Sequence, residues 1–181
     1  MAGKQAKILS VSDVSDLLVF ASCTRHSLRN CVIVLLAAKA GLRAGEIANL
    51  TWDMVLDPTG EIGPVIELRD SAAKNGSGRL IPVHPDLGQA LAAYRRLSPS
   101  LGAVIRSQRG GPMTPLSIVV WFNRAFRNIG LHGCSSHSGR QDVHHAGGAA
   151  RPQSRRLVVG CPVARRPPVD PNNSAVRRRR H

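Results

Sequence analysis

The apolar periodicity of this chain stops at Arg140, and this break limits how much of the sequence can fold. Up to Arg140, apolar residues recur at helix-like or strand-like spacing. Residues 141–181 hold nine arginines and two aspartates and show no sustained apolar period. Such a segment cannot bury enough apolar surface to offset the entropy that ordering costs. The sequence therefore predicts one folded domain over residues 1–140 and a disordered, basic, Arg/Pro-rich tail over residues 141–181.

The formal net charge of +14 predicts a polyanionic partner, most simply nucleic acid. Positive charge is present in both parts of the chain and is densest in the tail, which ends in four consecutive arginines before the final histidine. This distribution predicts nonspecific, salt-dependent attraction to DNA.

Neither a membrane span nor a disulfide framework is expected. The longest apolar run, "CVIVLLAAKAG", is too short to cross a bilayer and contains Lys39. The four cysteines show no CxxC pairing, which favours reduced intracellular thiols. The chain opens without a signal peptide, so we expect a cytoplasmic protein.

The body of the chain reads as helices around one small hairpin. Asn75-Gly76 and Gly78 supply the turn between two strand-like segments, "PVIELRD" and "RLIPVH", which predicts a β-hairpin. Helices are expected in five further stretches, with start or stop signals at Ser10, Ser12, Gly41, Pro85, Thr114, Pro115 and Gly130: "SVSDVSDLLVFAS", "SLRNCVIVLLAAKAG", "RAGEIANLTWDMV", "PDLGQALAAYRRL" and "TPLSIVVWFNRAFRNIG". The predicted fold class is α+β, mainly α-helical with a small antiparallel sheet.

Five residues at long spacing could carry chemistry. Arg43 and Glu46 open the third helix, Lys74 lies near the hairpin tip, and "HSGR" contributes His137 and Arg140. Each alone is unremarkable, because an Arg–Glu pair three apart on a helix is usually a solvated ion pair and a hairpin lysine usually improves solubility. Their order along one chain is the informative feature.

Taken together, these features resemble the catalytic domain of the tyrosine recombinases, also called phage integrases, over roughly residues 8–140. The strongest stretch is "AGLRAGEIANLTWDMVL". By resemblance, Arg43 is the first catalytic arginine and Glu46 the acidic residue that orients it. Lys74 is then the hairpin lysine, and the histidine and arginine of "HSGR" form the His-x-x-Arg motif. We also expect the chain to lack the N-terminal DNA-clamping domain found in many members.

The resemblance implies cleavage of a DNA backbone phosphate by a tyrosine hydroxyl, with no metal and no cofactor. Two arginines can neutralise the phosphoryl oxygens, which implies DNA contacts by Arg43, Lys74 and Arg140. The lysine can protonate the leaving 5′-oxygen, and the histidine can hold the proton of the nucleophile. His144 and His145 lie near His137 without acidic or cysteine partners at ligand spacing, so no metal site is expected there.

The nucleophile that the family requires is missing. The family places its tyrosine a few tens of residues after His-x-x-Arg, behind a motif that ends in Gly-His. The single tyrosine of this chain is Tyr94, which lies upstream in "LAAYRRL" and reads as an amphipathic helix residue. The expected enzyme is therefore inactive as it stands.

A one-base shift of the reading frame accounts for the missing tyrosine. Read one base later, codons for residues 141–145 are compatible with Arg-Thr-Phe-Ile-Thr, and codons for residues 160–176 are compatible with "DVQLLAGHRSIQTTQRY". That string contains Gly-His followed by a tyrosine. The hypothesis is a frameshift near codon 140 or 141 that replaced the last helices, and it predicts uncovered apolar surface on the helices around residues 31–40 and 115–129.

Three readings of function remain open at this point. The chain is a site-specific DNA recombinase or integrase with an incomplete active site, a non-catalytic DNA-binding remnant, or a pseudogene product. The expected partners are double-stranded DNA and other recombinase subunits, with no membrane and no small-molecule substrate.

Overall fold

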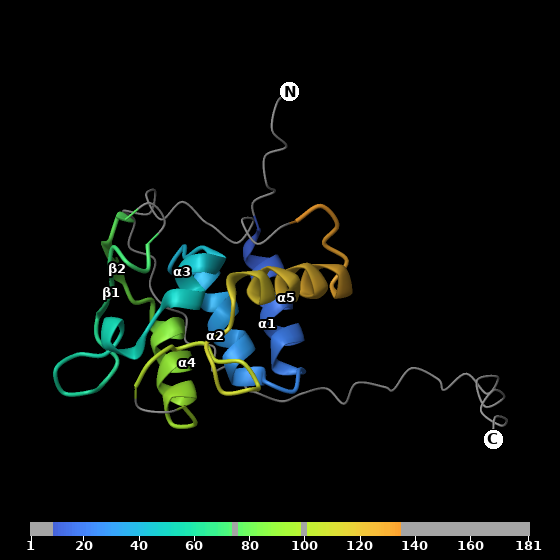
Figure 1. The fold of residues 1–181 in the computed structure, drawn as a ribbon. Coiled ribbons are helices and arrows are strands. Elements are labelled where there is room, and N and C mark those ends of the chain that lie inside the picture. Colours follow the sequence, from blue (N-terminus) through green and yellow to red (C-terminus); the bar gives the residue numbers. More distant parts are fainter. Residues whose placement is uncertain (1–8, 74–75, 99–100, 135–181) are drawn as a thin grey trace, which may run out of the picture.

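The computed structural model describes residues 9–73, 76–98 and 101–134 (Figure 1). The elements run in the order α1 (Val11–Ser22), α2 (Ser27–Ala38), α3 (Ala44–Asn49), the 3-10 turn η1 (Trp52–Met54), β1 (Val65–Leu68), β2 (Arg79–Pro82), α4 (Pro85–Arg95) and α5 (Pro115–Asn128). This arrangement confirms the predicted fold class, because the described part is mostly helical with one two-stranded antiparallel sheet. The expected tail, residues 141–181, lies outside the described residues.

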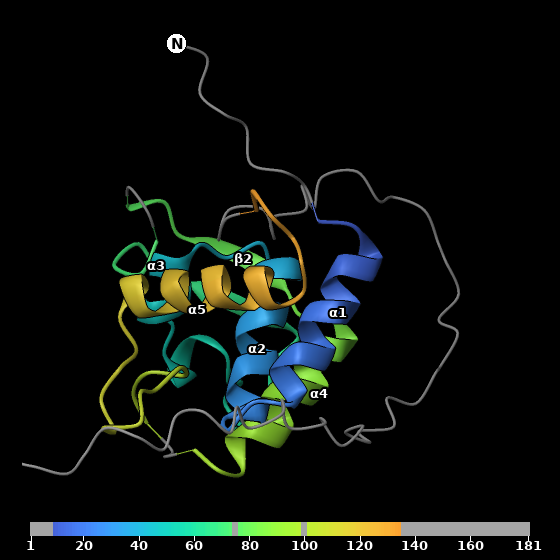
Figure 2. The same ribbon diagram turned by 90° about the vertical axis from the view of Figure 1, so that its right-hand side faces the viewer.

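Helix α2 is the centre of the core. Every residue from Val32 to Ala38 is buried, and α2 contacts α1 on one side and α4 on another (Figures 1 and 2). Helix α1 contacts α2 and α5, and it buries Val14, Leu17 and Ala21, which recur at helical spacing. A helix buried on all sides explains the nearly unbroken apolar run of its sequence.

The ends of the helices follow the sequence signals. Ser10 caps α1 in a capping box with Asp13, and Thr114 caps α5 through the N–H of Ser117. Gly41 adopts a positive φ of 64°, and the next N–H, that of Leu42, bonds back to the carbonyl of Leu36 at 3.1 Å. This closure ends α2 and directs the chain into α3.

The predicted hairpin is present. Strands β1 and β2 pair antiparallel in a register that places Ile66 opposite Ile81 and Leu68 opposite Arg79. Ile66, Leu68 and Ile81 are buried in the core, whereas Leu80 on the other face of β2 is exposed. The alternation anchors one face of the hairpin beside α3 (Figure 1).

The expectation of uncovered apolar surface is only partly right. On α2 it is wrong, because the residues from Val32 to Ala38 are covered by neighbouring elements of the described part. On α5 it holds, because Leu116 and Val120 are exposed at 72% and 55%. The inner face of α5, with Ile118 and Phe122, packs into the core.

Candidate active site

Arg43 and Glu46 form one unit at the start of α3. Arg43 is the N-cap residue, and its backbone N–H donates to Oε2 of Glu46 at 2.9 Å. Its guanidinium Nη1 also donates to Oε1 of Glu46 at 3.3 Å. A guanidinium carries five N–H donors, so most of those on Arg43 are not used by this contact and can serve an anion.

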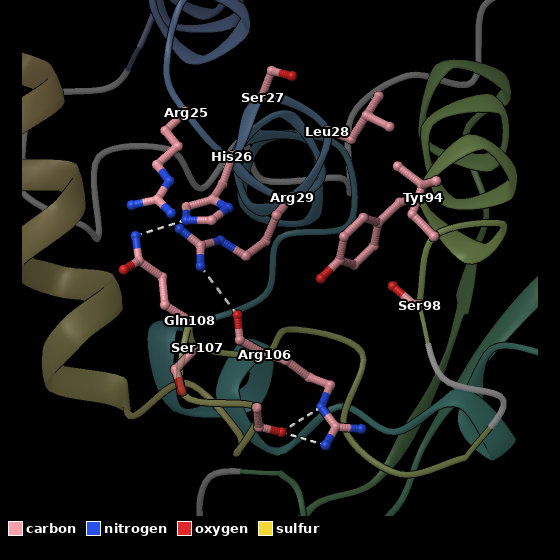
Figure 3. A pocket seen from close by; sticks show the side chains of 12 residues that line it. Arg25, His26, Ser27, Leu28, Arg29, Tyr94, Ser98, Arg106, Ser107 and Gln108 are labelled. Atoms are coloured by element: carbon pink, nitrogen blue, oxygen red, sulfur yellow. Dashed lines mark hydrogen bonds between the residues drawn. The ribbon is translucent and has the colours of Figure 1, made fainter.

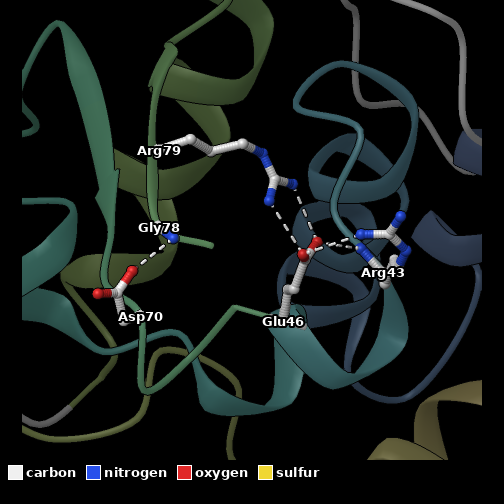
Figure 4. Close-up of polar contacts among 5 residues, drawn as sticks. All are labelled: Arg43, Glu46, Asp70, Gly78 and Arg79. Carbon is white, nitrogen blue, oxygen red and sulfur yellow. Dashed lines mark hydrogen bonds and ion pairs between the residues drawn. The ribbon is translucent and has the colours of Figure 1, made fainter. Parts of the chain in front are cut away.

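Arg79 completes the site from the hairpin, as Figure 4 shows. Its Nη1 and Nη2 donate to Oε1 and Oε2 of Glu46, each at 3.0 Å, in a bidentate ion pair. Glu46 thus lies between two arginines from segments more than thirty residues apart in the sequence. The pair ties the first strand residue of β2 to α3 and holds the hairpin against the helix that carries Arg43.

Glu46 is buried and remains ionised. Burial by itself raises the pKa of this carboxyl, but the hydrogen bonds from Arg79 and from the Arg43 backbone, with the positive charges of both arginines, outweigh that effect. Together, these hydrogen bonds and charges lower the pKa of Glu46 to about 2. Two guanidiniums around one carboxylate leave one net positive charge, and the Arg43 side chain retains 30% exposure. The cluster therefore presents a partly exposed, oriented cation.

The base of the hairpin loop is held by a second contact. The N–H of Gly78 donates to Oδ1 of Asp70 at 2.7 Å, which closes the loop between the two strands (Figure 4). A Cβ at Gly78 would lie 2.7 Å from the carbonyl oxygen of Leu68, so the backbone approach requires glycine. Lys74 belongs to this loop, but it lies outside the described residues.

The structure brings together two of the five predicted site residues. Arg43 and Glu46 are in contact, whereas Lys74, His137 and Arg140 lie outside the described residues.

Arg79 is a further site residue, which the motifs of the sequence do not single out. A signal for it was available in the alternation of β2, where Arg79 shares the inward face with buried Ile81. An arginine on the inward face of a strand needs an acidic partner, and Glu46 is that partner.

Tyr94 lies away from this site, near the end of α4. Its ring centroid is 6.3 Å from that of Trp52, and its side chain lines a pocket beside the first turn of α2. Arg43 follows the opposite end of α2, which spans 12 residues and is about 18 Å long. Figures 1 and 2 show α3 above and the C-terminal part of α4 below in both views.

Within the described ranges, no group of three or more His, Cys, Asp or Glu side chains is placed to hold a metal ion. No helix in the same part of the chain is long and apolar enough to cross a membrane.

Comparison with known proteins decides the family. The model of the "Phage integrase family" matches residues 7–145, more than three quarters of the sequence. The chain belongs to the phage integrase family. The match includes "AGLRAGEIANLTW", and its described part contains the contact between Arg43 and Glu46.

Two curated members of this family are similar to the chain over part of their length. Tyrosine recombinase XerC of Mesorhizobium japonicum is 35% identical over 94 residues, which covers 50% of this chain and 28% of that protein. Tyrosine recombinase XerC of Brucella melitensis is 32% identical over 89 residues, which covers 47% of this chain and 26% of that protein. The matched stretch therefore spans only about a quarter of these relatives.

Solved structures share the fold at low sequence identity. The XerA recombinase matches with a TM-score of 0.60 and 19% identity, covering 77% of this chain and 48% of that chain. A lambda integrase dimer bound to a COC′ core site matches with a TM-score of 0.61 and 20% identity, covering 77% of this chain and 40% of that chain. These matches show that the described elements have the architecture of an integrase catalytic domain.

Proposed function

We propose that this chain is a DNA-binding member of the site-specific recombinases that engages a backbone phosphate but does not cleave the strand. The observation that carries the proposal is that Glu46 forms ion pairs with both Arg43 and Arg79. A buried carboxylate that fixes a partly exposed arginine preorganises the remaining donors of that arginine for a phosphate oxygen. The lambda integrase neighbours bound to DNA support duplex DNA as the partner.

Strand cleavage by the chemistry of this family requires a tyrosine hydroxyl at the site. Tyr94 is the single tyrosine of the sequence, and α2 separates it from Arg43. In the proposed site, Arg43 binds phosphate with its free donors, and Lys74, His137 and Arg140 add the remaining cationic and proton-transfer groups. Without an attacking hydroxyl, these groups bind the phosphate but the phosphodiester bond is not cleaved.

Binding of duplex DNA tests the phosphate contact. We expect Arg43→Gln to reduce the slope of log affinity against log salt by about 1, because one phosphate contact is lost. Arg96→Gln is the matched control, since Arg96 is exposed at the C-cap of α4 and is also an arginine. Equal slopes for the Arg43 and Arg96 variants would contradict the proposed contact.

A second candidate function is a non-catalytic DNA-binding remnant whose affinity comes from charge alone. The net charge of +14 and the terminal arginine run favour it. In that case removal of residues 141–181, whose nine arginines and two aspartates carry half of the net charge, weakens binding strongly, and Arg43→Gln has no more effect than Arg96→Gln. A pseudogene product without any function would show no saturable binding of duplex DNA at physiological salt.

We further propose that the chain after Arg140 is read one base out of frame from the family's original sequence. The compatible string "DVQLLAGHRSIQTTQRY" in the offset frame of residues 160–176 supports this origin. Sequencing the gene across codons 138–178 tests it. We expect the offset reading frame to be open and to encode Gly-His followed by a tyrosine. Stop codons in that frame would contradict the frameshift.

A further inference from the structure

A pocket of about 450 Å³ lies beside the first turn of α2, at the other end of this helix from Arg43. Three segments distant in sequence form it: the α1–α2 connection, the end of α4 and the turn around residues 106–110 (Figure 3). Its cationic lining consists of Arg25, Arg29 and Arg106. Because Arg43, Glu46 and Arg79 are not among the residues that line it, the pocket is separate from the cluster around Glu46.

Arg29 is fixed in this pocket by a buried amide. Its Nε and Nη2 donate to Oδ1 of Asn30 at 3.2 and 3.1 Å, and its Nη1 donates to the carbonyl of Arg106 at 3.1 Å. Asn30 is only 3% exposed and is itself held, since its Nδ2 donates to Oγ1 of Thr24 at 2.7 Å. These contacts use three of the five guanidinium donors and leave two for a ligand.

The charged side chains that line the pocket are all cationic. No aspartate or glutamate is among its lining residues, and within the described part neither Arg25, Arg29 nor Arg106 forms an ion pair. Burial, followed by the charges of Arg29 and Arg25, lowers the pKa of His26. The His26 side chain does not cap α2, so the positive end of the helix also faces the pocket.

The remaining wall is suited to an organic group next to an anion. Tyr94, Leu28 and Leu97 line it, and Figure 3 shows the Tyr94 ring across from the Arg29 side chain. Leu97 is 75% exposed, so its apolar side chain is accessible to a ligand in the pocket. A cavity of this size, with cations at one side and an aromatic ring at the other, matches a nucleotide in volume and chemistry.

We propose that this pocket binds the phosphate group of a nucleotide, with Arg25 and the two remaining donors of Arg29 on the phosphate oxygens and Tyr94 beside the base or sugar. Bidentate guanidinium donors match phosphate geometry. The phosphate can come from a free nucleotide or from a DNA strand. The proposal does not depend on recombinase chemistry, and it concerns residues outside the Glu46 cluster.

Titration of the full chain with 2′-deoxyadenosine 5′-monophosphate, inorganic phosphate and a short duplex tests the proposal. The test variant is Arg25→Gln, because Arg25 is exposed and its loss leaves the Asn30–Arg29 contacts in place. Arg109→Gln is the matched control, since Arg109 is exposed in the neighbouring turn and does not line the pocket. Circular dichroism of all three proteins verifies equal folding.

We expect saturable binding of the nucleotide that is tighter than that of inorganic phosphate. Arg25→Gln should weaken nucleotide binding by about tenfold or more, as expected for loss of a charge-assisted contact, and Arg109→Gln by less than twofold. Loss of duplex affinity in Arg25→Gln alone, without nucleotide binding, would assign the phosphate to the DNA backbone and support the site. Identical behaviour of the two variants towards all three ligands would overturn it.

Discussion

Glu46 is the residue on which the candidate active site depends. It is buried, its carboxylate forms ion pairs with the guanidinium groups of Arg43 and Arg79, and it lies where α3 meets the hairpin. Removing its charge leaves Arg43 and Arg79 facing one another without a counter-ion. Because both arginines keep about a third of their side chains in solvent, water screens part of that repulsion.

We therefore expect Glu46→Gln to lower the free energy of unfolding by about 1–3 kcal/mol. Urea unfolding followed by circular dichroism measures it. Asp86→Asn is the matched control, because Asp86 is exposed in the first turn of α4, and it should change stability much less. If Glu46→Gln lowers the free energy of unfolding no more than Asp86→Asn does, the ion pairs of Glu46 with the two arginines do not stabilise the fold.

The pH dependence of stability follows from the same carboxyl. The pKa of Glu46 falls from an ordinary value of 4.5 to about 2 on folding. The stabilisation from this group is therefore fully present above about pH 4.5 and is lost as the pH falls towards 2. Unfolding free energies between pH 6 and pH 2 should decline more steeply for the natural chain than for Glu46→Gln. Parallel profiles for the two proteins would contradict the depressed pKa.

At the scale of elements, the hairpin and α3 form one connected unit. Arg79 links β2 to α3, and the contact between Gly78 and Asp70 closes the loop that carries Lys74. The loop base is therefore positioned relative to Arg43 through Glu46. Loosening either contact should release the hairpin while the helical core remains folded.

Gly78→Ala tests this coupling, because its Cβ would lie 2.7 Å from the Leu68 carbonyl oxygen. We expect faster amide hydrogen exchange in β1 and β2 and unchanged exchange in α5. Gly111→Ala is the control, since a Cβ there meets nothing within 4 Å. Unchanged exchange in both strands of Gly78→Ala would show that the close approach is not needed.

The helices and the hairpin could be predicted from sequence because their signals are local. Ser10, Pro85 and Thr114 mark helix starts through hydrogen bonds or backbone geometry within a few residues, and Gly41 marks an end. The ion pair of Arg79 with Glu46 could not be derived in this way, because a pairing across 33 positions depends on how the hairpin packs. The predicted exposure of α2 is wrong for the same reason, since α1 and α4 bury this helix from distant parts of the chain.

For the whole molecule, the described elements already enclose a continuous core. This core reaches from Leu9 near the start of α1 to Phe126 on α5. We propose that residues 1–140 fold without the tail. Deletion of residues 141–181 should leave the urea midpoint unchanged and reduce duplex affinity, because nine arginines are removed. A collapse of the unfolding transition after the deletion would show that the tail completes the core.

Covalent trapping on DNA tests most directly the claim that this domain holds a phosphate-binding site without a nucleophile. The full chain and a restored version, with the offset frame after Arg140, are incubated with nicked suicide duplexes that cover the DNA flanking the gene. We expect a covalent protein–DNA adduct for the restored version, none for the chain as it stands, and none for the restored version carrying Arg43→Gln. An adduct formed by the chain as it stands would contradict the absence of a nucleophile, and loss of that adduct in Tyr94→Phe would identify Tyr94 as the attacking residue.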